Sequence, residues 1–488
     1  GPVGAVVWLE GGDLFQGTVE SNSVEGKSVV DGMNAAGLDA AAIGNHEFDY
    51  GPVGPSVIPM KPGDDPRGAL KARIASAKFP FLAANIIDDA TNKPVAWPNT
   101  RPSTVITAAG VKVGVIGLAT IDTPHTTTVT NFKGLHMIAL KDAVLTQAKA
   151  LRAQGAKVVA ITAHAGGNCN SVADPLDLAS CDNDSEIFQL ARALPAGTVD
   201  VIVAGHTHRQ LAQIVNGIPI IQSWANGRGF ARVDLDVDAK TGAVKLVKVH
   251  APQKMCVDSG LKDDVGACTP ADVDGAHVAP DKKTLAAVQP YIDAAQKVKA
   301  RKLGVTIKSE LKRGYDRESA LGNLFADAML EAAHDVGWKA DVALMNGGGI
   351  RANLGAGELT YGEVFEMMPF DNRYARISTT GKVLREWLEH NLSATKGGIL
   401  SIAGATADIA CDGGRAHVTL KRADGKALAD ADHVDIVTTD FLATGGESTK
   451  LPADSITLDE GDPIREHVAR VLQKHGGALD GDDRALFD

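Results

Sequence analysis

The chain has 488 residues, about three times the length of a typical single domain, so two or more hydrophobic cores are expected. Hydrophobic residues make up 44% and charged residues 22%, a composition typical of soluble globular proteins that excludes collagen-like and largely disordered chains. The formal net charge is −11 and no dense Lys/Arg run occurs, which excludes the charge pattern of proteins that bind nucleic-acid polymers or anionic membranes. No apolar stretch approaches the roughly 18–20 residues that a membrane-spanning helix needs.

Through about residue 250, apolar runs rich in β-formers alternate with amphipathic helical segments. The expected strands are 5–10, 39–43, 79–86, 111–120, 158–164 and 199–204, and the expected helices are 143–153 and 185–194. This alternation predicts a layered α/β domain.

The remainder of the chain predicts a second α/β domain after a connecting helix. Short strands broken by turn residues at 218–250 predict a β-meander at the end of the first domain, and 281–303 has the Ala/Lys/Gln-rich pattern of a helix. The second domain is expected to contain helices near 318–333 and 463–474 and strands at 341–345 and 434–438. The predicted boundaries are therefore 1–280, a linker helix at 281–303, and 304–488.

Four of the five cysteines form two local pairs in polar, loop-like sequence, Cys169 with Cys181 and Cys256 with Cys268. Such pairs favour disulfides, and disulfides favour a periplasmic or secreted protein. The alternatives are four free thiols in a cytosolic enzyme and, least favoured because no histidines stand at the required spacing, structural zinc. We expect the fifth cysteine, Cys411, to be a small buried hydrophobic residue rather than a nucleophile.

Polar side chains that can bind metals follow the expected strands of the first half. A histidine that stands alone after a strand is more often a structural residue than a ligand. Together, however, an Asp, an Asn and three His at successive strand ends provide the mixed oxygen and nitrogen ligands that suit two divalent cations such as Zn²⁺ or Mn²⁺. The five candidate ligands are Asp13, Asn45, His164, His206 and His208.

The segment Gly44-Asn45-His46-Glu47-Phe48-Asp49 also offers an acid–base pair. His46 and Asp49 lie three residues apart, so in a helical turn Asp49 can hold the imidazole of His46. That imidazole is then expected to donate to a phosphoryl oxygen or a leaving group rather than to bind metal. A pair of cations close together can activate a bound water and stabilise a phosphoryl group during in-line attack, which predicts hydrolysis of a phosphate ester.

These motifs, followed by Asn346-Gly347-Gly348-Gly349-Ile350-Arg351, resemble in order those of the 5′-nucleotidase family. The resemblance implies a four-layer α/β/β/α metallophosphoesterase domain with two metal ions, followed by an α/β domain that binds nucleotides. It implies that Asp13 bridges the two ions, that Asn45, His164 and His206 hold one of them, and that His208 helps to hold the other. His46 and Asp49 correspond to the pair that stabilises the transition state.

In the second domain the resemblance assigns substrate-binding residues. Arg317 and Arg351 resemble the arginines that meet the phosphate, a task that suits the guanidinium group, and Asn346 resembles the residue that hydrogen-bonds the base. Phe370 and Phe441 resemble the two residues between which the base stacks; from the residues alone, ordinary core packing is the favoured interpretation of both.

Two features of the sequence depart from the family pattern. Family members have an Asp-x-His strand before Gly11-Gly12-Asp13 that supplies two ligands to one ion, and this sequence begins after that point. We expect that the natural protein has a preceding N-terminal segment; the alternative is that one ion is lost. The second departure is Glu447, which stands where the family commonly has an Asp that accepts the ribose hydroxyls.

The sequence therefore predicts a metal-dependent phosphoric monoester hydrolase that removes phosphate from nucleoside 5′-monophosphates. A 2′,3′-cyclic nucleotide phosphodiesterase and a UDP-sugar hydrolase are the alternatives within the same chemistry, and a nucleotide-binding module with an incomplete metal centre is the alternative of another class. The expected partner is a small nucleotide, without nucleic-acid polymer or membrane span, and the sequence leaves the oligomeric state open. The N-terminus, Gly1-Pro2-Val3-Gly4, lacks the basic-then-apolar pattern of a signal peptide.

Overall fold

A computed structural model describes residues 4–238, 240–257, 269–335, 337–393, 398–413, 415–446, 455–459 and 461–479. The chain divides into two compact units. The first comprises Gly1–Gln16, Val24–Thr127 and Asn131–Pro290, and the second Gly17–Ser23, Thr128–Thr130 and Tyr291–Asp488. Among the described helices, none combines the length and the apolar character needed to cross a membrane.

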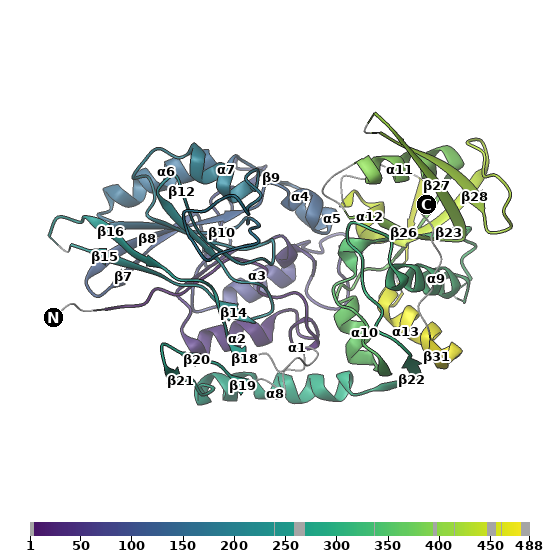
Figure 1. The fold of residues 1–488 in the computed structure, drawn as a ribbon, viewed down its shortest axis with the longest axis horizontal. Coiled ribbons are helices and arrows are strands. Elements are labelled where there is room, and N and C mark those ends of the chain that lie inside the picture. The colour runs from purple at the N-terminus through teal and green to yellow at the C-terminus, as the bar shows by residue number, and fades with distance from the viewer. Residues whose placement is uncertain are drawn as a thin grey trace. The chain divides into compact units, whose positions relative to one another are not determined.

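Two β-sheets form the centre of the first unit (Figure 1). One is entirely parallel and has the order β1 (Leu9–Glu10), β2 (Ala40–Ala42), β3 (Phe81–Leu82) and β6 (Thr100–Arg101). The other has the order β12 (Leu211–Val215), β13 (Ile218–Gln222), β11 (Val201–Ala204), β10 (Val158–His164), β8 (Val111–Ala119) and β7 (Ser103–Ala108), and it is parallel except at its two edge strands.

Both sheets bury both of their faces, because successive side chains of a strand point to opposite sides. In β8, Val115 packs between the two sheets whereas Ile116 packs under the helices. Helices α6 (Leu140–Ala153) and α7 (Glu186–Ala193) cover the outer face of the six-stranded sheet. Helices α2 (Lys27–Ala36) and α3 (Gly68–Ser76) cover the outer face of the four-stranded sheet. The predicted α/β/β/α layering is thereby confirmed.

The two sheets pack closely at Gly117 of β8, where a Cβ would come within 2.2 Å of the Leu82 Cβ atom. The expected strand 79–86 is wrong as a single element, because the chain leaves the sheet after β3 and forms a separate three-stranded sheet from β4 (Ile86–Asp88), β5 (Lys93–Pro94) and β9 (Leu135–Met137). Of the expected meander at 218–250, β13 joins the main sheet, while β15 (Val233–Val237) and β16 (Val244–Val249) form a hairpin.

The first half of the chain also contains shorter elements. They are the helical turns α1 (Val19–Asn22), α4 (Thr123–Thr126) and α5 (Val129–Phe132), and the paired strands β14 (Gly229–Phe230) with β17 (Gln253–Lys254), β18 (Cys256–Val257) with β19 (Thr269–Pro270), and β20 (Asp272–Val273) with β21 (Ala276–His277). The long helix α8 (Lys282–Lys299) follows, and the division between the units falls within it.

The second unit is built on a five-stranded sheet with the order β26 (Leu400–Ala403), β23 (Val342–Asn346), β29 (His433–Thr439), β25 (Tyr374–Thr380) and β30 (Ile456–Leu458). Helices α9 (Ala320–Asp335), α10 (Tyr361–Met367) and α13 (Ile464–His475) share one hydrophobic core with this sheet. Helix α11 (Gly381–Ser393) and the hairpin β27 (Ala405–Asp412) and β28 (Arg415–Arg422) share the core on its other face. A second sheet has the order β24 (Gly357–Thr360), β22 (Lys302–Ile307) and β31 (Gly477–Leu479).

The cysteines divide into oxidised and free residues. Cys169 and Cys181 form a disulfide across 12 residues; Cys256 is also disulfide-bonded, and Cys268 lies outside the described residues. The expectation that Cys411 is buried is wrong, because this residue is exposed and its thiol is free. It lies on the same side of β27 as the buried Ala405 and Ala407, but beyond the part of the hairpin that the core covers.

Candidate functional site

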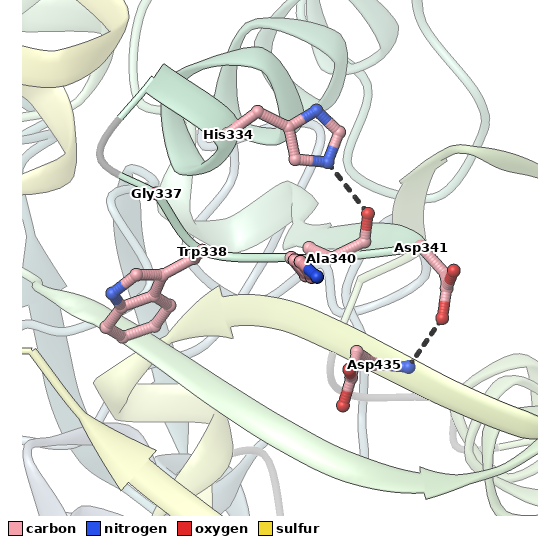
Figure 2. Close-up of a pocket in the computed structure, with 7 residues that line it drawn as sticks. His334, Gly337, Trp338, Ala340, Asp341 and Asp435 are labelled. Carbon is pink, nitrogen blue, oxygen red and sulfur yellow. Dashed lines mark hydrogen bonds between the residues drawn. The ribbon is translucent and has the colours of Figure 1, made fainter.

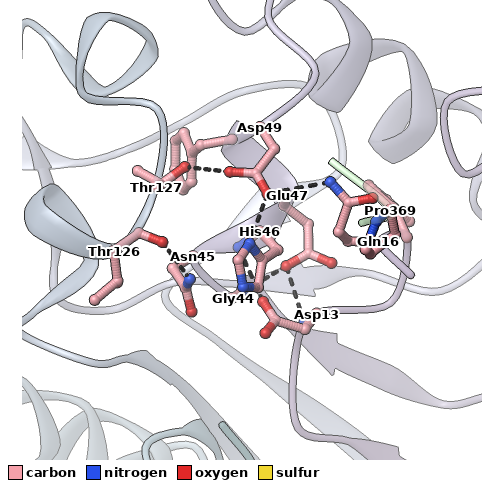
Figure 3. A network of polar contacts seen from close by, with 12 residues as sticks. Asp13, Gln16, Gly44, Asn45, His46, Glu47, Asp49, Thr126, Thr127 and Pro369 are labelled. Atoms are coloured by element: carbon pink, nitrogen blue, oxygen red, sulfur yellow. Dashed lines mark hydrogen bonds and ion pairs between the residues drawn. The ribbon is translucent and has the colours of Figure 1, made fainter. Parts of the chain in front are cut away.

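The candidate metal ligands of the first unit lie where parallel strands end. Asp13 follows β1, Asn45 follows β2, His164 is the last residue of β10, and His206 follows β11. Parallel neighbouring strands end at the same edge of a sheet, so residues far apart in the sequence meet there. Figure 3 shows Asp13, Asn45 and His46 from two of these loops side by side.

The side chains of Asp13, Asn45 and His206 converge on the imidazole of His164. Its Nε2 atom lies 3.0 Å from Asp13 Oδ2, 2.9 Å from Asn45 Oδ1 and 3.0 Å from His206 Nδ1. Its other ring nitrogen, Nδ1, donates a hydrogen bond to the carbonyl oxygen of Gly11 at 2.9 Å. That bond fixes the tautomer and turns Nε2 toward the group, as is usual for a histidine that binds a metal.

The ligand atoms of Asp13, His164 and His206 all lie within 4.8 Å of one another, and the amide oxygen of Asn45 joins them. One carboxylate, one amide oxygen and two imidazole nitrogens are a donor set that fits Zn²⁺ or Mn²⁺. The structure does not bring His208 into this group; its side chain is exposed.

Charges and burial within the group favour the ligand forms of Asp13 and His206, but not that of His164. Burial opposes ionisation of Asp13, but the neighbouring His164 and His46 hold the pKa of its carboxyl below the usual value. Burial and the proximity of His164 lower the pKa of His206 to about 3, which keeps that imidazole neutral. Although burial acts in the opposite direction, the Asp13 carboxylate raises the pKa of His164 to about 9, so metal binding at Nε2 would release a proton.

The backbone at the site is strained. Asp13, His206 and His208 have φ values of 61°, 75° and 55°, which lie in the left-handed region that non-glycine residues seldom occupy. Such conformations persist where surrounding contacts impose them, and they concentrate at functional sites. Gly44 permits the close approach of the two loops, since a Cβ at this position would lie 2.3 Å from Asp13 Oδ1.

Glu47 supplies the contacts that hold the Asp13 turn, a role that the sequence did not suggest. Its carboxylate is completely buried and accepts hydrogen bonds from the backbone N–H groups of Asp13 (3.0 Å), Leu14 (2.5 Å) and Gly44 (2.6 Å). Glu47 therefore joins the loop after β1 to the loop after β2. No sequence pattern signals this role, because the partners are main-chain groups about thirty residues away.

Replacing Glu47 by Gln is expected to weaken metal binding by roughly 10–100-fold, the usual cost of losing an outer-shell partner. The amide can accept at only one atom, so either the bond from Leu14 N–H to Oε1 or the bonds from Asp13 and Gly44 N–H to Oε2 are lost. Titration with Co²⁺, followed by its visible absorption, measures the affinity. Glu186→Gln is the matched control, because the Glu186 carboxylate accepts a hydrogen bond from the backbone N–H of Ile121 on another loop. Equal metal affinity in Glu47→Gln and in this control would contradict the role of Glu47.

His46 and Asp49 form the predicted pair within a 3-10 turn over His46–Phe48. Nδ1 of His46 lies 2.6 Å from Asp49 Oδ2, so the imidazole can donate this proton to the carboxylate and present Nε2 to a substrate. Gln16 donates to the same carboxylate at 3.2 Å, and the hydroxyl of Thr127 donates to its other oxygen at 3.0 Å (Figure 3). Sequence reasoning missed Gln16 and Thr127, because neither belongs to a pattern that links it to Asp49.

In the second unit, Asn346 is buried at the end of β23. The turn Gly347–Gly349 then leads to Arg351, whose guanidinium carbon lies 5.0 Å from the ring centroid of Phe370. The structure thus brings Arg351 and Phe370 together. The Phe370 side chain is partly exposed and belongs to none of the described hydrophobic cores.

The other candidate substrate-binding residues are Phe441, Arg317 and Glu447. Phe441 is partly exposed in α12 (Asp440–Ala443) and packs against the core beneath α11. The Arg317 side chain is 79% exposed and pairs with its neighbour Asp316 at 3.3 Å. Glu447 lies outside the described residues.

A cavity of about 420 Å³ in the second unit lies away from these residues (Figure 2). Its lining includes His334, Trp338 and Asp341, and Asp341 immediately precedes β23. Asn346 ends the same strand. The cavity therefore lies at the opposite end of β23 from the residues predicted to bind nucleotide.

Comparison with known proteins agrees with these observations. Residues 297–453 match the family model described as 5′-nucleotidase, C-terminal domain. The chain is 29% identical to Endonuclease YhcR of Bacillus subtilis over 89% of its own length and 32% of that protein, and 28% identical to the 5′-nucleotidase of Vibrio cholerae over 91% of its own length and 78% of that protein. It thus spans about a third of one relative and about three-quarters of the other.

A solved structure shares the fold across the whole chain. The 5′-nucleotidase precursor of Thermus thermophilus superposes with a TM-score of 0.77 at 24% identity, over 100% of this chain and 90% of that one. The family model covers residues 297–453, the two relatives align with about nine-tenths of the chain, and the shared fold covers both units. Together, these comparisons support the 5′-nucleotidase family for this chain.

Proposed function

We propose that this chain hydrolyses nucleoside 5′-monophosphates to a nucleoside and phosphate, using two divalent cations held at the Asp13 site. The observation that carries the proposal is the convergence of Asp13, Asn45 and the two imidazoles around His164 Nε2, in the same loops as the His46–Asp49 pair. The 28% identity to the 5′-nucleotidase of Vibrio cholerae supports the same substrate class. Zn²⁺ and Mn²⁺ are the cations that the donor set favours.

The residues of the first unit would have separate roles in this hydrolysis. Bound cations would acidify a water molecule and neutralise charge on the phosphoryl oxygens. Asp13 would bridge them, Asn45, His164 and His206 would hold one, and His208 would contribute to the other. When the P–O bond to the nucleoside breaks, His46 would stabilise or protonate the leaving oxygen through Nε2 while Asp49 holds its Nδ1 proton.

The second unit would supply the nucleotide site. Arg351 and Arg317 would meet the phosphate, which suits placed guanidinium groups in a protein of net charge −11. Asn346 would hydrogen-bond the base, and Phe370 and Phe441 would stack on it. Glu447 would accept hydrogen bonds from the ribose.

Two measurements on the same preparation test this proposal. Metal analysis should find about two ions per chain, and activity should be higher on AMP than on 2′,3′-cyclic AMP or UDP-glucose. A preference for either of the latter substrates would assign the chain to a phosphodiesterase or a sugar-nucleotide hydrolase with the same metal chemistry. Nucleotide binding with one ion or none, and without turnover, would identify a binding module instead.

Replacing Phe441 by Ala should raise the KM for AMP by about 5–100-fold, because a stacked base is worth about 1–3 kcal/mol. The KM for ribose 5-phosphate, which has the same sugar and phosphate but no base, should stay within about twofold. Steady-state kinetics on both substrates measures the difference. Trp338→Ala is the control, since Trp338 is an aromatic residue at the cavity on the opposite end of β23. An equal rise in both KM values would contradict stacking.

We also propose that the protein works in the periplasm or outside the cell. The Cys169–Cys181 disulfide supports this proposal, because disulfides persist in oxidising compartments and are rare in the cytosol.

A further inference from the structure

Arg465, in the first turn of α13, is the most buried arginine of the second unit among the described residues, with 4% of its surface exposed. A guanidinium group is seldom buried unless charged or polar partners surround it. The partners of Arg465 are Tyr361, Phe365 and Glu466 and three residues of the segment 368–372.

The guanidinium holds this segment at several points. Nη1 donates to the carbonyl oxygens of Met368 and Phe370, both at 3.1 Å, and Nη2 donates to Asp371 Oδ1 at 2.6 Å. Its carbon atom lies 4.0 Å from the ring centroid of Phe365. The neighbouring backbone N–H of Ile464 donates to the carbonyl oxygen of Asn372 at 2.8 Å. The first turn of α13 therefore fixes the main chain on both sides of Phe370.

The same segment contacts other residues of the proposed nucleotide site. The backbone N–H of Arg351 donates to the carbonyl oxygen of Met367 at 2.7 Å, and the Arg351 guanidinium lies beside the Phe370 ring. Asp440 Oδ1 accepts from the Asn372 amide at 2.9 Å and from the backbone N–H of Phe441 at 2.8 Å. The position of segment 368–372 thus sets where the Phe370 ring lies with respect to Arg351 and Phe441.

We propose that Arg465 is a positioning residue for the base of the bound nucleotide, acting through Phe370. The inference rests on the proposed function, in which Phe370 stacks on the base. Arg465 is buried and bonded to the protein itself, so its effect on the ligand is indirect. The forked shape of the guanidinium matters, because it reaches two carbonyl oxygens and a carboxylate at once, whereas a lysine ammonium is a single point charge.

Calorimetric titration with adenosine in the presence of EDTA tests the proposal without turnover and without bound metal. We expect Arg465→Met to weaken adenosine binding about tenfold, which corresponds to about 1.4 kcal/mol, and Arg465→Lys to give an intermediate loss. Arg470→Met is the matched control on the same helix, because the Arg470 side chain is 54% exposed and pairs with Asp462. It should bind adenosine like the wild type.

A double-mutant cycle with Phe370→Ala separates positioning from a general structural role. If Arg465 acts through Phe370, Arg465→Met should weaken adenosine binding less than twofold further once Phe370 has been removed. An undiminished tenfold loss in the Phe370→Ala background would overturn the proposal, as would wild-type affinity in Arg465→Met. If Arg465→Met fails to fold by circular dichroism, the same cycle is run with Arg465→Lys and judged by the same criterion. A wild-type protein that binds neither adenosine nor AMP would instead overturn the nucleotide site itself.

Discussion

Replacing Asp13 by Ala is expected to abolish metal loading and hydrolysis together. Among the residues that the structure describes, Asp13 is the one carboxylate whose oxygen lies in the group around His164 Nε2, so the variant leaves no anionic ligand in that group to attract a divalent cation. The loss of affinity should exceed about 100-fold, beyond the usual effect of outer-shell changes. Metal content per chain after gel filtration, together with AMP turnover, measures both quantities.

The control for this variant is Asp177→Ala, which removes an exposed carboxylate of the same unit. It should keep the metal content and the turnover of the wild type. The Asp13→Ala protein should stay folded, because the bonds from the Asp13 and Leu14 N–H groups to Glu47 are made by the main chain. A metal content unchanged from the wild type would rule out Asp13 as a bridging ligand.

Replacing His46 by Ala should separate chemistry from metal binding. The variant is expected to keep its metal ions, because the contact from residue 46 to Asp13 Oδ1 is made by the backbone N–H, at 2.9 Å. Turnover should fall by about 10²–10⁴-fold, the usual contribution of a positioned proton donor. Single-turnover rates on AMP with metal-saturated protein measure the chemical step.

The control for this variant is a second histidine–carboxylate pair, His136 with Asp89, at the surface. His136 Nδ1 also lies 2.6 Å from a carboxylate oxygen, that of Asp89, but both side chains are about half exposed. His136→Ala should leave turnover unchanged, since an exposed pair of this kind contributes little. If His46→Ala loses its metal as completely as Asp13→Ala, then the division between ligands and a proton-donating pair is wrong.

Most of the group around His164 Nε2 could be predicted from the sequence, because its residues follow or end regular elements. Each candidate stands directly after an apolar run, and parallel strands place such residues at one edge. His164 illustrates this point, since β10 has the predicted bounds and ends with this residue. His208 has the same sequence signal and yet its side chain is exposed, in a loop where both His206 and His208 have left-handed φ values.

The residues that hold the site together were not predictable in this way. Glu47 belongs to a predicted motif, but its partners are backbone N–H groups of another loop. Gln16 and Thr127 reach Asp49 from segments without a regular pattern. Arg465 lies in an amphipathic helix, where a charged residue ordinarily faces water, and its burial depends on the return of segment 368–372 to α13.

By itself, the sequence determined the layered α/β architecture, the order of the metal-binding motifs and the local His46–Asp49 pair, since each depends on side-chain type and on spacing within a strand or turn. Only the tertiary structure decided which carboxylate anchors the Asp13 turn, which arginine holds the Phe370 segment, and that Cys411 is exposed. The physical reason is that these contacts join main-chain groups or packed surfaces distant in sequence. The hydrophobic periodicity of the sequence carries no information about which distant segments contact one another.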